Sequence, residues 1–275
     1  MDLAKHVYVS KELDPSGKIH WDNIENETWQ KLVARQEKVI IDRACDEFMH
    51  GLEVINFPKD RAPQLDEVNK VLDRMTGWGV HPVPAIIQPK EFFTLLANKR
   101  FPAATFIRRP EDMEYLQEPD IFHELYGHTP LLTNQGYADF MQKFGEIALK
   151  AEPKDRRQLF RLFWFTIEFG LVKTSKGLRC YGGGILSSIG ETQYALTDKS
   201  EKVPFDALEA LRTPYRIDIM QPMYFVLQDM KDLFSILDQD VLALLQEAKK
   251  LGDFAPKYPP VQKSTEKDCE KELPC

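Results

Sequence analysis

The sequence lacks the features that would place the chain in a membrane or on a nucleic acid. It contains no run of about 18 apolar residues, the length that crosses a bilayer, and residues 1–6 carry no apolar core of a secretory signal. Basic residues are fewer than acidic ones, 36 against 43, and the net charge is −7. We therefore expect no membrane partner and no nucleic-acid partner, since proteins that bind nucleic acid neutralise phosphates with basic patches.

Cysteine is scarce, and its spacing excludes the common metal and redox motifs. Cys45, Cys180, Cys269 and Cys275 form no C-x-x-C pair, so the chain has neither a zinc ribbon nor a thioredoxin motif. Free thiols are typical of a reducing compartment, and we expect a cytoplasmic protein.

What the chain does contain is enough material for one large domain. Its 275 residues are 43% hydrophobic and 29% charged, as in ordinary globular proteins. We expect an irregular N-terminal arm at 1–20, one catalytic domain at 21–255 and a flexible C-terminal tail at 256–275. This tail has no apolar heptad repeat, so a monomer or homodimer is expected rather than a coiled-coil tetramer.

The apolar pattern predicts a mainly α fold with a small β component (α+β). Apolar residues at steps of three and four predict helices at 22–51, 64–76, 90–98, 137–151, 156–173, 187–195, 204–211 and 230–251. Strands are expected at 101–108 and 220–227, and two short ones around a turn at 173–180. The run Tyr181-Gly182-Gly183-Gly184 is expected to be a flexible joint.

Two histidines near the middle of the chain are candidate metal ligands. His123 and His128 are five residues apart, which is about 140° of rotation on an α-helix. The zincin motif instead places its histidines four apart, on one helix face. We therefore expect the two imidazoles to converge only if the helix ends or distorts near Gly127, ahead of Pro130.

Glu168 is the third candidate ligand. It lies inside the aromatic run Phe163-Trp164-Phe165-Thr166-Ile167-Glu168-Phe169. An unpaired carboxylate buried there would cost much desolvation energy, which a cation would offset. Two imidazoles and one carboxylate form the facial set of non-haem Fe(II) oxygenases, although the residues alone leave zinc open.

Each of these residues also has a purely structural interpretation. His123 alone could be a core histidine bonded to a backbone carbonyl, and Glu168 could pair with Arg161. Asp120, three residues before His123, favours the metal, because ligating histidines commonly donate their other ring N–H to a carboxylate.

Three strings resemble the pterin-dependent aromatic amino acid hydroxylases. They are EPDIFHELYGHTPL at 118–131, WFTIEFGL at 164–171 and YGGGILSSIGE at 181–191. They occur in the order of that family, whose bacterial members the chain resembles most, and the similarity runs from about residue 21 to residue 256. The resemblance implies a catalytic domain of that family's type. It also implies conversion of L-phenylalanine to L-tyrosine with O2 and a tetrahydropterin, tetrahydrobiopterin or a relative, at a non-haem Fe(II).

The resemblance also assigns roles to individual residues. It implies metal ligands at His123, His128 and Glu168, which with Glu124 form the catalytic set. The residues implied to bind the pterin are Ile86, Ile87, Phe92 and Glu124. The residues implied to bind the amino acid are Arg108, Pro119, Trp164, Phe169 and Ser187, with Arg108 on the carboxylate.

For two of these assignments an adjacent residue could take the same role, and two other positions differ from the family pattern. Phe93 could take the place of Phe92, and Arg109 is the neighbour of Arg108. Leu116 stands where many members have a threonine near the substrate carboxylate. Phe163 stands where animal members have a tyrosine near the iron, so a role for that hydroxyl is excluded.

Three alternative functions remain at this stage. A hydroxylase of the same family could act on tryptophan or tyrosine, since pocket shape decides the substrate. A zinc hydrolase could use the same three ligands with metal-bound water and no reductant. A non-enzymatic binding or structural protein would hold no metal and tolerate His128→Ala.

Overall fold

The computed structural model describes residues 8–258, except 85, 115 and 117. Among these residues the α-helices are α1 (Asn23–Val39), α2 (Asp46–Ile55), α3 (Leu65–Thr76), α4 (Pro89–Ala97), α5 (Thr129–Leu132), α6 (Gln135–Lys150), α7 (Arg156–Phe163), α8 (Gly183–Leu186), α9 (Ile189–Tyr194), α10 (Ala207–Arg212), α11 (Met230–Ser235) and α12 (Val241–Leu251). Two π-helices, η2 (His123–His128) and η3 (Trp164–Glu168), and two 3₁₀-helices, η1 (Pro110–Asp112) and η4 (Ile236–Asp238), complete the helical part.

Two small sheets account for the strands. Strands β1 (Gly79–Val83) and β2 (Arg100–Ala104) pair in parallel, with Gly79 opposite Arg100. The other sheet has the order β4-β3-β6-β5 and contains β3 (Leu171–Thr174), β4 (Gly177–Cys180), β5 (Glu201–Pro204) and β6 (Met223–Leu227). Strand β3 is antiparallel to β4 and parallel to β6, and β5 is parallel to β6. The mainly α fold with a small β component is therefore confirmed.

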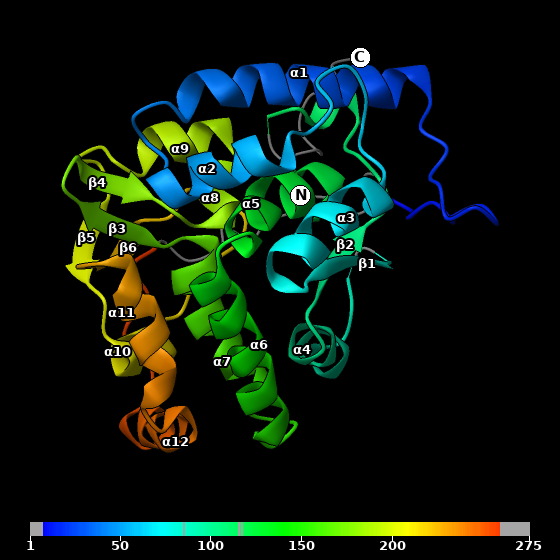
Figure 1. Cartoon of the computed structure of the whole chain (residues 1–275). Helices are drawn as coiled ribbons and strands as arrows, with labels where there is room; N and C mark the ends of the chain where they lie inside the picture. The colour runs from blue at the N-terminus through cyan, green and yellow to red at the C-terminus, as the bar shows by residue number, and fades with distance from the viewer. Residues whose placement is uncertain (1–7, 85, 115, 117, 259–275) are drawn as a thin grey trace, which may run out of the picture.

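The elements surround a central group of short helices. Figure 1 shows α1 lying across one side of the molecule, with the four-stranded sheet and the β1–β2 pair on opposite flanks and α6 and α7 extending away between them. Helix α4 packs on α6, α2 on α5, and α8 on η2. One hydrophobic core runs through these contacts and includes fully buried Trp29, Tyr126 and Phe144. The short central helices α5 and α8 are thereby buried inside the fold.

Local sequence signals explain where several helices begin. Asp22 caps α1, and its carboxylate and Glu25 form a capping box. Gln64 and Glu67 form the same device on α3, and Gly77 with φ +74° ends that helix. Pro89 occupies the first turn of α4. None of the described helices is both long and apolar enough to cross a bilayer.

The structure corrects the predicted course of three helices. The stretch 22–51 forms two helices rather than one, because Asp42 takes φ +58° between α1 and α2 and Ala44 bridges to Cys180. The stretch 156–173 changes from α to π at Trp164 and then enters β3. The stretch 230–251 is split by η4. In all three cases the apolar pattern continues across a change in backbone conformation that it does not mark.

Two other expectations are corrected, and residues near both limits of the described region contact the body of the protein. The glycine run is no flexible joint, because residues 181–184 are buried and lead into α8. Strand β5 was not predicted, and the helix expected from residue 204 begins only at Ala207, after β5 has ended at Pro204. Lys11 N–H in the irregular arm donates to Thr105 O at 2.9 Å. Lys257 forms an ion pair with Glu201, and the predicted tail beyond residue 258 lies outside the described residues.

Candidate active site

The two histidines share one face because the helix widens around them. Residues His123–His128 form the π-helix η2, in which hydrogen bonds join residues five apart. A five-residue step therefore returns to the same side of the helix. Of the two alternatives, a helix that ends and a helix that distorts near Gly127, the structure has the distortion, since the chain continues directly into α5. Glu168 closes the second π-helix, where Phe169 N–H donates to Trp164 O, five residues back, at 2.8 Å.

The three predicted ligands meet at one point. His128 Nε2 lies 3.2 Å from His123 Nε2 and 3.3 Å from Glu168 Oε1, and His123 Nε2 lies 3.7 Å from Glu168 Oε2. The donor atoms of this trio all lie within 4.8 Å of one another. Metal–ligand bonds of about 2.1 Å at right angles would separate neighbouring donors by about 3 Å. The trio therefore has the spacing and the chemistry of the facial set that holds non-haem iron.

Ser187 fixes the protonation of His123. The Ser187 hydroxyl donates to Gly183 O at 2.8 Å, and its oxygen lies 2.9 Å from His123 Nδ1. A hydroxyl has one proton to give, so Ser187 Oγ accepts from His123 Nδ1–H. That tautomer leaves the lone pair of Nε2 free to face His128 and Glu168. Burial also lowers the pKa of His123 to about 4, so the imidazole is neutral near pH 7, as a ligand must be.

Gly183 and Phe101 pack against the ring of His128. A Cβ at position 183 would lie 2.4–2.7 Å from three atoms of the His128 ring, so only glycine fits there. Phe101 from β2 stacks on the other side of the ring, 4.8 Å away at 29°. His128 is buried, and its Nδ1 has no hydrogen-bond partner among the described residues. Its ring position is therefore set by packing.

Glu168 is more buried than most carboxylates, with only 15% of its side chain exposed. Burial would raise its pKa, but the two neighbouring imidazoles and the Gly184 N–H outweigh that effect, so the pKa lies below its usual value. The adjacent acid behaves in the opposite way. Burial, followed by the charges of Glu168 and Asp120, raises the pKa of Glu124 well above its usual value. The site thus favours the charged form of Glu168 and disfavours the charged form of Glu124.

Asp120 acts on Arg108 and the backbone rather than on the His123 ring. Its Oδ2 accepts from Arg108 Nε at 2.8 Å and its Oδ1 from Nη2 at 2.9 Å, and Oδ1 also accepts from the His123 backbone N–H at 3.0 Å. The expectation that Asp120 orients the His123 imidazole is therefore wrong, because Asp120 bonds the backbone N–H of His123 and Ser187 is the partner of the ring Nδ1. Asp120 instead fixes the guanidinium and the first turn of η2.

A large cavity opens in front of the metal ligands. Its volume is about 710 Å³, within the range of small-molecule sites. The sequence-predicted residues that line it are His123, Glu168, Glu124, Ile86, Ile87, Phe92, Arg108, Pro119, Trp164, Phe169 and Ser187. Of the predicted site residues only His128 does not line it, since it is buried behind His123 and Glu168. The structure therefore brings the whole predicted set to one place.

The cavity lining distinguishes between adjacent residues that the sequence left as alternatives. Phe92 lines it, whereas Phe93 is fully buried in the core. Arg108 lines it, whereas Arg109 is exposed with its guanidinium over Tyr8. The two departures from the family pattern, Leu116 and Phe163, both line the cavity as well.

Sequence reasoning missed one wall of the cavity. Tyr215 stacks on Trp164 at 4.3 Å and 16° and lines the cavity together with Glu191 and residues 217–220. Gln221 accepts a hydrogen bond from Trp164 Nε1 at 3.1 Å. Gly190-Glu191 ended the third matching string, but nothing near residues 215–221 in the sequence marks a binding loop.

Comparison with known proteins gives a consistent match. Residues 2–266 match the model of the "Biopterin-dependent aromatic amino acid hydroxylase" family. A "Phenylalanine-4-hydroxylase" of Pseudomonas aeruginosa is 54% identical over 255 residues, which cover 93% of this chain and 97% of that protein. These matches cover nearly the whole chain.

Solved structures agree. The apo phenylalanine hydroxylase of Colwellia psychrerythraea 34H superposes with a TM-score of 0.88 at 54% identity, covering 91% of this chain and 97% of that one. Phenylalanine hydroxylase of Chromobacterium violaceum with bound Fe(III) gives 0.83 at 38% identity, covering 90% and 94%. With this family match and the metal trio in place, the chain belongs to the biopterin-dependent aromatic amino acid hydroxylases.

Proposed function

We propose that the protein is a phenylalanine 4-monooxygenase, which converts L-phenylalanine to L-tyrosine with O2 and a tetrahydropterin. The observation that carries this proposal is the trio His123, His128 and Glu168 facing a cavity of about 710 Å³ with aromatic walls. Such a cavity suits a planar cofactor and an aromatic amino acid side by side. The curated relative named above supports the choice of phenylalanine.

The metal and the pterin carry the redox chemistry, and the chain holds them. His123, His128 and Glu168 would bind Fe(II) through Nε2, Nε2 and a carboxylate oxygen. When bound, Fe(II) and the tetrahydropterin supply the electrons that activate O2 for insertion of one oxygen atom into the ring. The protein supplies position and an apolar enclosure that limits side reactions with water.

The pterin side of the cavity is formed by Phe92, Ile86, Ile87 and Glu124. Phe92 is held by edge-on contacts to Phe93 and Phe163, 5.5 and 5.2 Å away, which fix its ring as a stacking surface. Burial raises the pKa of Glu124 well above its usual value, which favours the protonated form, whose O–H could donate to the ring nitrogens or oxygen of the cofactor.

The amino acid side is formed by Arg108, Pro119, Trp164 and Phe169. Asp120 occupies Nε and Nη2 of Arg108 on one edge of the guanidinium. The Nη1 edge is left to receive the substrate carboxylate, a geometry that suits arginine. Trp164 and Phe169, whose ring centroids lie 4.4 Å apart, together form one aromatic wall against which the substrate ring would pack.

Glu168→Ala tests the metal assignment. We expect the variant to lose iron and tyrosine formation, because a facial set with two ligands binds Fe(II) weakly. Glu114→Ala is the matched control, since Glu114 also lines the cavity but pairs with Arg35 instead of the histidines. Iron content and product are measured together, and full retention of both by Glu168→Ala would refute the facial set.

A substrate panel tests the choice of amino acid. The iron-loaded protein is given L-phenylalanine, L-tryptophan or L-tyrosine with a tetrahydropterin, and hydroxylated products are followed by chromatography. We expect the highest kcat/KM with phenylalanine. A higher value with tryptophan or tyrosine would assign the chain to another activity of the same family.

We also propose that residues 21–255 form one catalytic domain, which works as a monomer or homodimer in the cytoplasm. A single hydrophobic core from Ile19 to Ala248 supports the one-domain assignment. Light scattering of the purified chain tests the assembly, and a tetramer would contradict it.

A further inference from the structure

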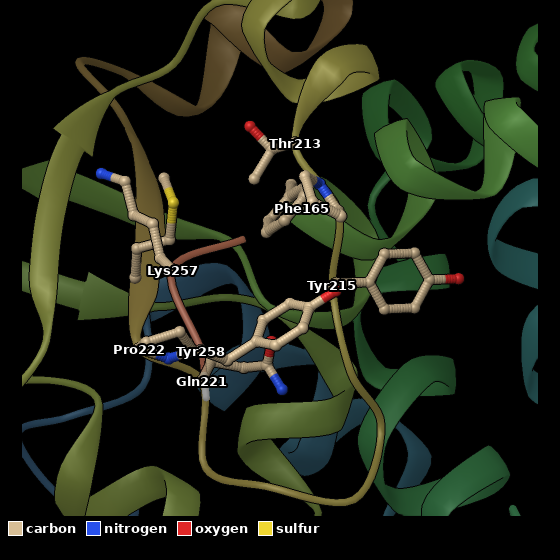
Figure 2. A pocket seen from close by; sticks show the side chains of 9 residues that line it. Phe165, Thr213, Tyr215, Gln221, Pro222, Lys257 and Tyr258 are labelled. Carbon is tan, nitrogen blue, oxygen red and sulfur yellow. The ribbon is translucent and has the colours of Figure 1, made fainter. Parts of the chain in front are cut away.

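The side chain of Tyr215 separates the large cavity from a second, smaller one. Trp164 lines the large cavity, and Tyr215 lines both. The small cavity, of about 10 Å³, is bounded by Tyr215, Gln221, Phe165 and Tyr258 among others. Figure 2 shows Tyr215, Gln221 and Tyr258 arranged around this space. Gln221 therefore lies behind the aromatic wall, outside the lining of the large cavity.

The side chain of Gln221 makes three hydrogen bonds that fix its orientation. Its Oε1 accepts from Trp164 Nε1 at 3.1 Å, and its Nε2 donates to Arg216 O at 3.0 Å and to Ile219 O at 3.1 Å. An indole N–H can only donate and a carbonyl can only accept. A flipped amide would therefore face donor with donor and acceptor with acceptor, so one orientation alone satisfies all three partners.

The backbone of Gln221 is anchored as firmly. Its N–H donates to Glu191 Oε1 at 3.1 Å, and the Tyr224 hydroxyl donates to the same oxygen. Glu191 and Tyr224 belong to α9 and β6, so the backbone of Gln221 is tied to two separate elements. Gln221 is only 2% exposed, so water does not compete for these bonds.

These bonds connect the wall of the cavity to its rim. Trp164 stacks between Phe169 at 4.4 Å and Tyr215 at 4.3 Å. The two carbonyls that Gln221 holds belong to Arg216 and Ile219. Residues 217–220 line the cavity and are exposed or half-buried, and we call the segment 216–220 the rim. One amide therefore fixes both the plane of the Trp164 indole and the course of the rim.

We propose that Gln221 is a positioning residue that sets the width of the amino acid pocket by fixing the Trp164 indole and the 216–220 rim. The proposal rests on the assignment of this cavity to an aromatic amino acid. It concerns binding of the amino acid and leaves the pterin side of the cavity, at Phe92 and Glu124, unaffected.

The test is a double-mutant cycle between Gln221→Leu and Trp164→Phe in the iron-loaded protein. Gln221→Leu should raise the KM for phenylalanine about tenfold, because the loss falls on amino acid binding, and leave the KM for the tetrahydropterin unchanged. In the Trp164→Phe background the same substitution should change the KM much less, since residues that act through one contact are not additive. Gln158→Leu is the control, because Gln158 is half-buried and donates to Leu211 O, away from the cavity.

A second measurement reports on the bond itself. In metal-free protein labelled with ¹⁵N-tryptophan, the indole signal that disappears in Trp164→Phe is that of Trp164. Its N–H should exchange slowly with solvent in the wild type and faster in Gln221→Leu. Gln221→Glu keeps an acceptor oxygen for the indole, so its Trp164 N–H should exchange more slowly than in Gln221→Leu and closer to the wild-type rate. Gln221→Glu takes the place of Gln221→Leu if that variant does not fold.

The outcomes are distinct. An unchanged KM for phenylalanine, additive effects in the cycle, or rapid exchange of the Trp164 N–H in the wild type would overturn the role of Gln221. Failure of the wild type to hydroxylate phenylalanine would instead overturn the proposed function, and the exchange measurement would still decide whether Gln221 holds the indole.

Discussion

At the scale of single residues, the site depends on side chains that hold the ligands as much as on the ligands. Ser187 gives its one proton to Gly183 O and so accepts from His123 Nδ1–H. Asp120 occupies one edge of Arg108 and leaves the other edge to the cavity. Both contacts set the direction in which a functional group points.

Ser187→Ala tests the first of these contacts. Removing the acceptor leaves both tautomers of His123 available, and we expect about 10–100-fold weaker iron binding, the usual effect of losing a partner of a ligating histidine. Iron affinity is measured by titration of the metal-free protein. Ser188→Ala is the control, because Ser188 Oγ accepts from Glu191 N–H in the first turn of α9 and does not contact His123. Equal iron affinity in Ser187→Ala and wild type would remove Ser187 from this role.

The sequence predicted the ligands and missed the residues behind them, for a physical reason. Glu168 was recognisable because a carboxylate inside an aromatic run needs a partner. Ser187 was expected to contact the substrate, and its bond to His123 spans 64 positions. Gln221 contacts Trp164 across 57 positions. Such contacts leave no pattern in the neighbouring sequence.

At the scale of elements, two π-helices build the metal site. The first carries His123 and His128 and the second carries Glu168, and both pack closely against the glycine run at 182–184, where α8 begins. Helices α3, α4 and α6 were predicted almost to the residue because caps and apolar periodicity coincide there. A π-turn has no such signature, since it shifts hydrogen bonds by one residue without changing composition.

Gly183→Ala tests the close contact between α8 and η2. The new Cβ would lie 2.4 Å from His128 Cε1, so the imidazole has to move and we expect iron binding to fall by at least tenfold. Gly190→Ala is the matched control, because its Cβ would meet only Met220 at 3.7 Å. Iron content and near-ultraviolet circular dichroism are compared. A Gly183→Ala protein with normal iron content would contradict the claim that Gly183 is needed to position the His128 ring.

Helix α3 gives a prediction for the effect of pH. Glu67 accepts from Gln64 N–H at 2.8 Å and pairs with Arg61 at 2.6 Å, and the Arg61 hydrogen bond holds the pKa of Glu67 below its usual value. A lowered pKa gives stability that is present above the unfolded pKa and is lost as the pH falls through the folded pKa. Glu67 is 37% exposed, so we expect Glu67→Gln to cost only about 0.5–1 kcal/mol at pH 7.

Urea unfolding of metal-free wild type and Glu67→Gln over a range of pH checks this prediction. The difference in free energy of unfolding should be full at neutral pH and vanish in acid. Glu27→Gln serves as control, since Glu27 is 63% exposed and makes only an i,i+4 pair with Lys31. A difference that persists unchanged in acid would show that the charge of Glu67 does not stabilise α3.

At the scale of the whole molecule, one continuous core fixes elements from distant parts of the chain around one cavity. Strand β2, the π-helices, α8 and the loop before β6 all contribute to the cavity lining. The mainly helical class was predictable from the periodicity of apolar residues, and the family from three sequence strings. The relative placement of these elements was not, because it depends on packing between residues far apart in sequence.

The most direct test of the central claim is product formation by the purified wild-type chain. The protein is incubated with Fe(II), a tetrahydropterin, O2 and L-phenylalanine, and again with each component omitted or with Zn²⁺ in place of iron. We predict L-tyrosine only when all four components are present, with the tetrahydropterin consumed in step with product. No tyrosine from the complete mixture, or equal turnover with zinc and no reductant, would contradict the account.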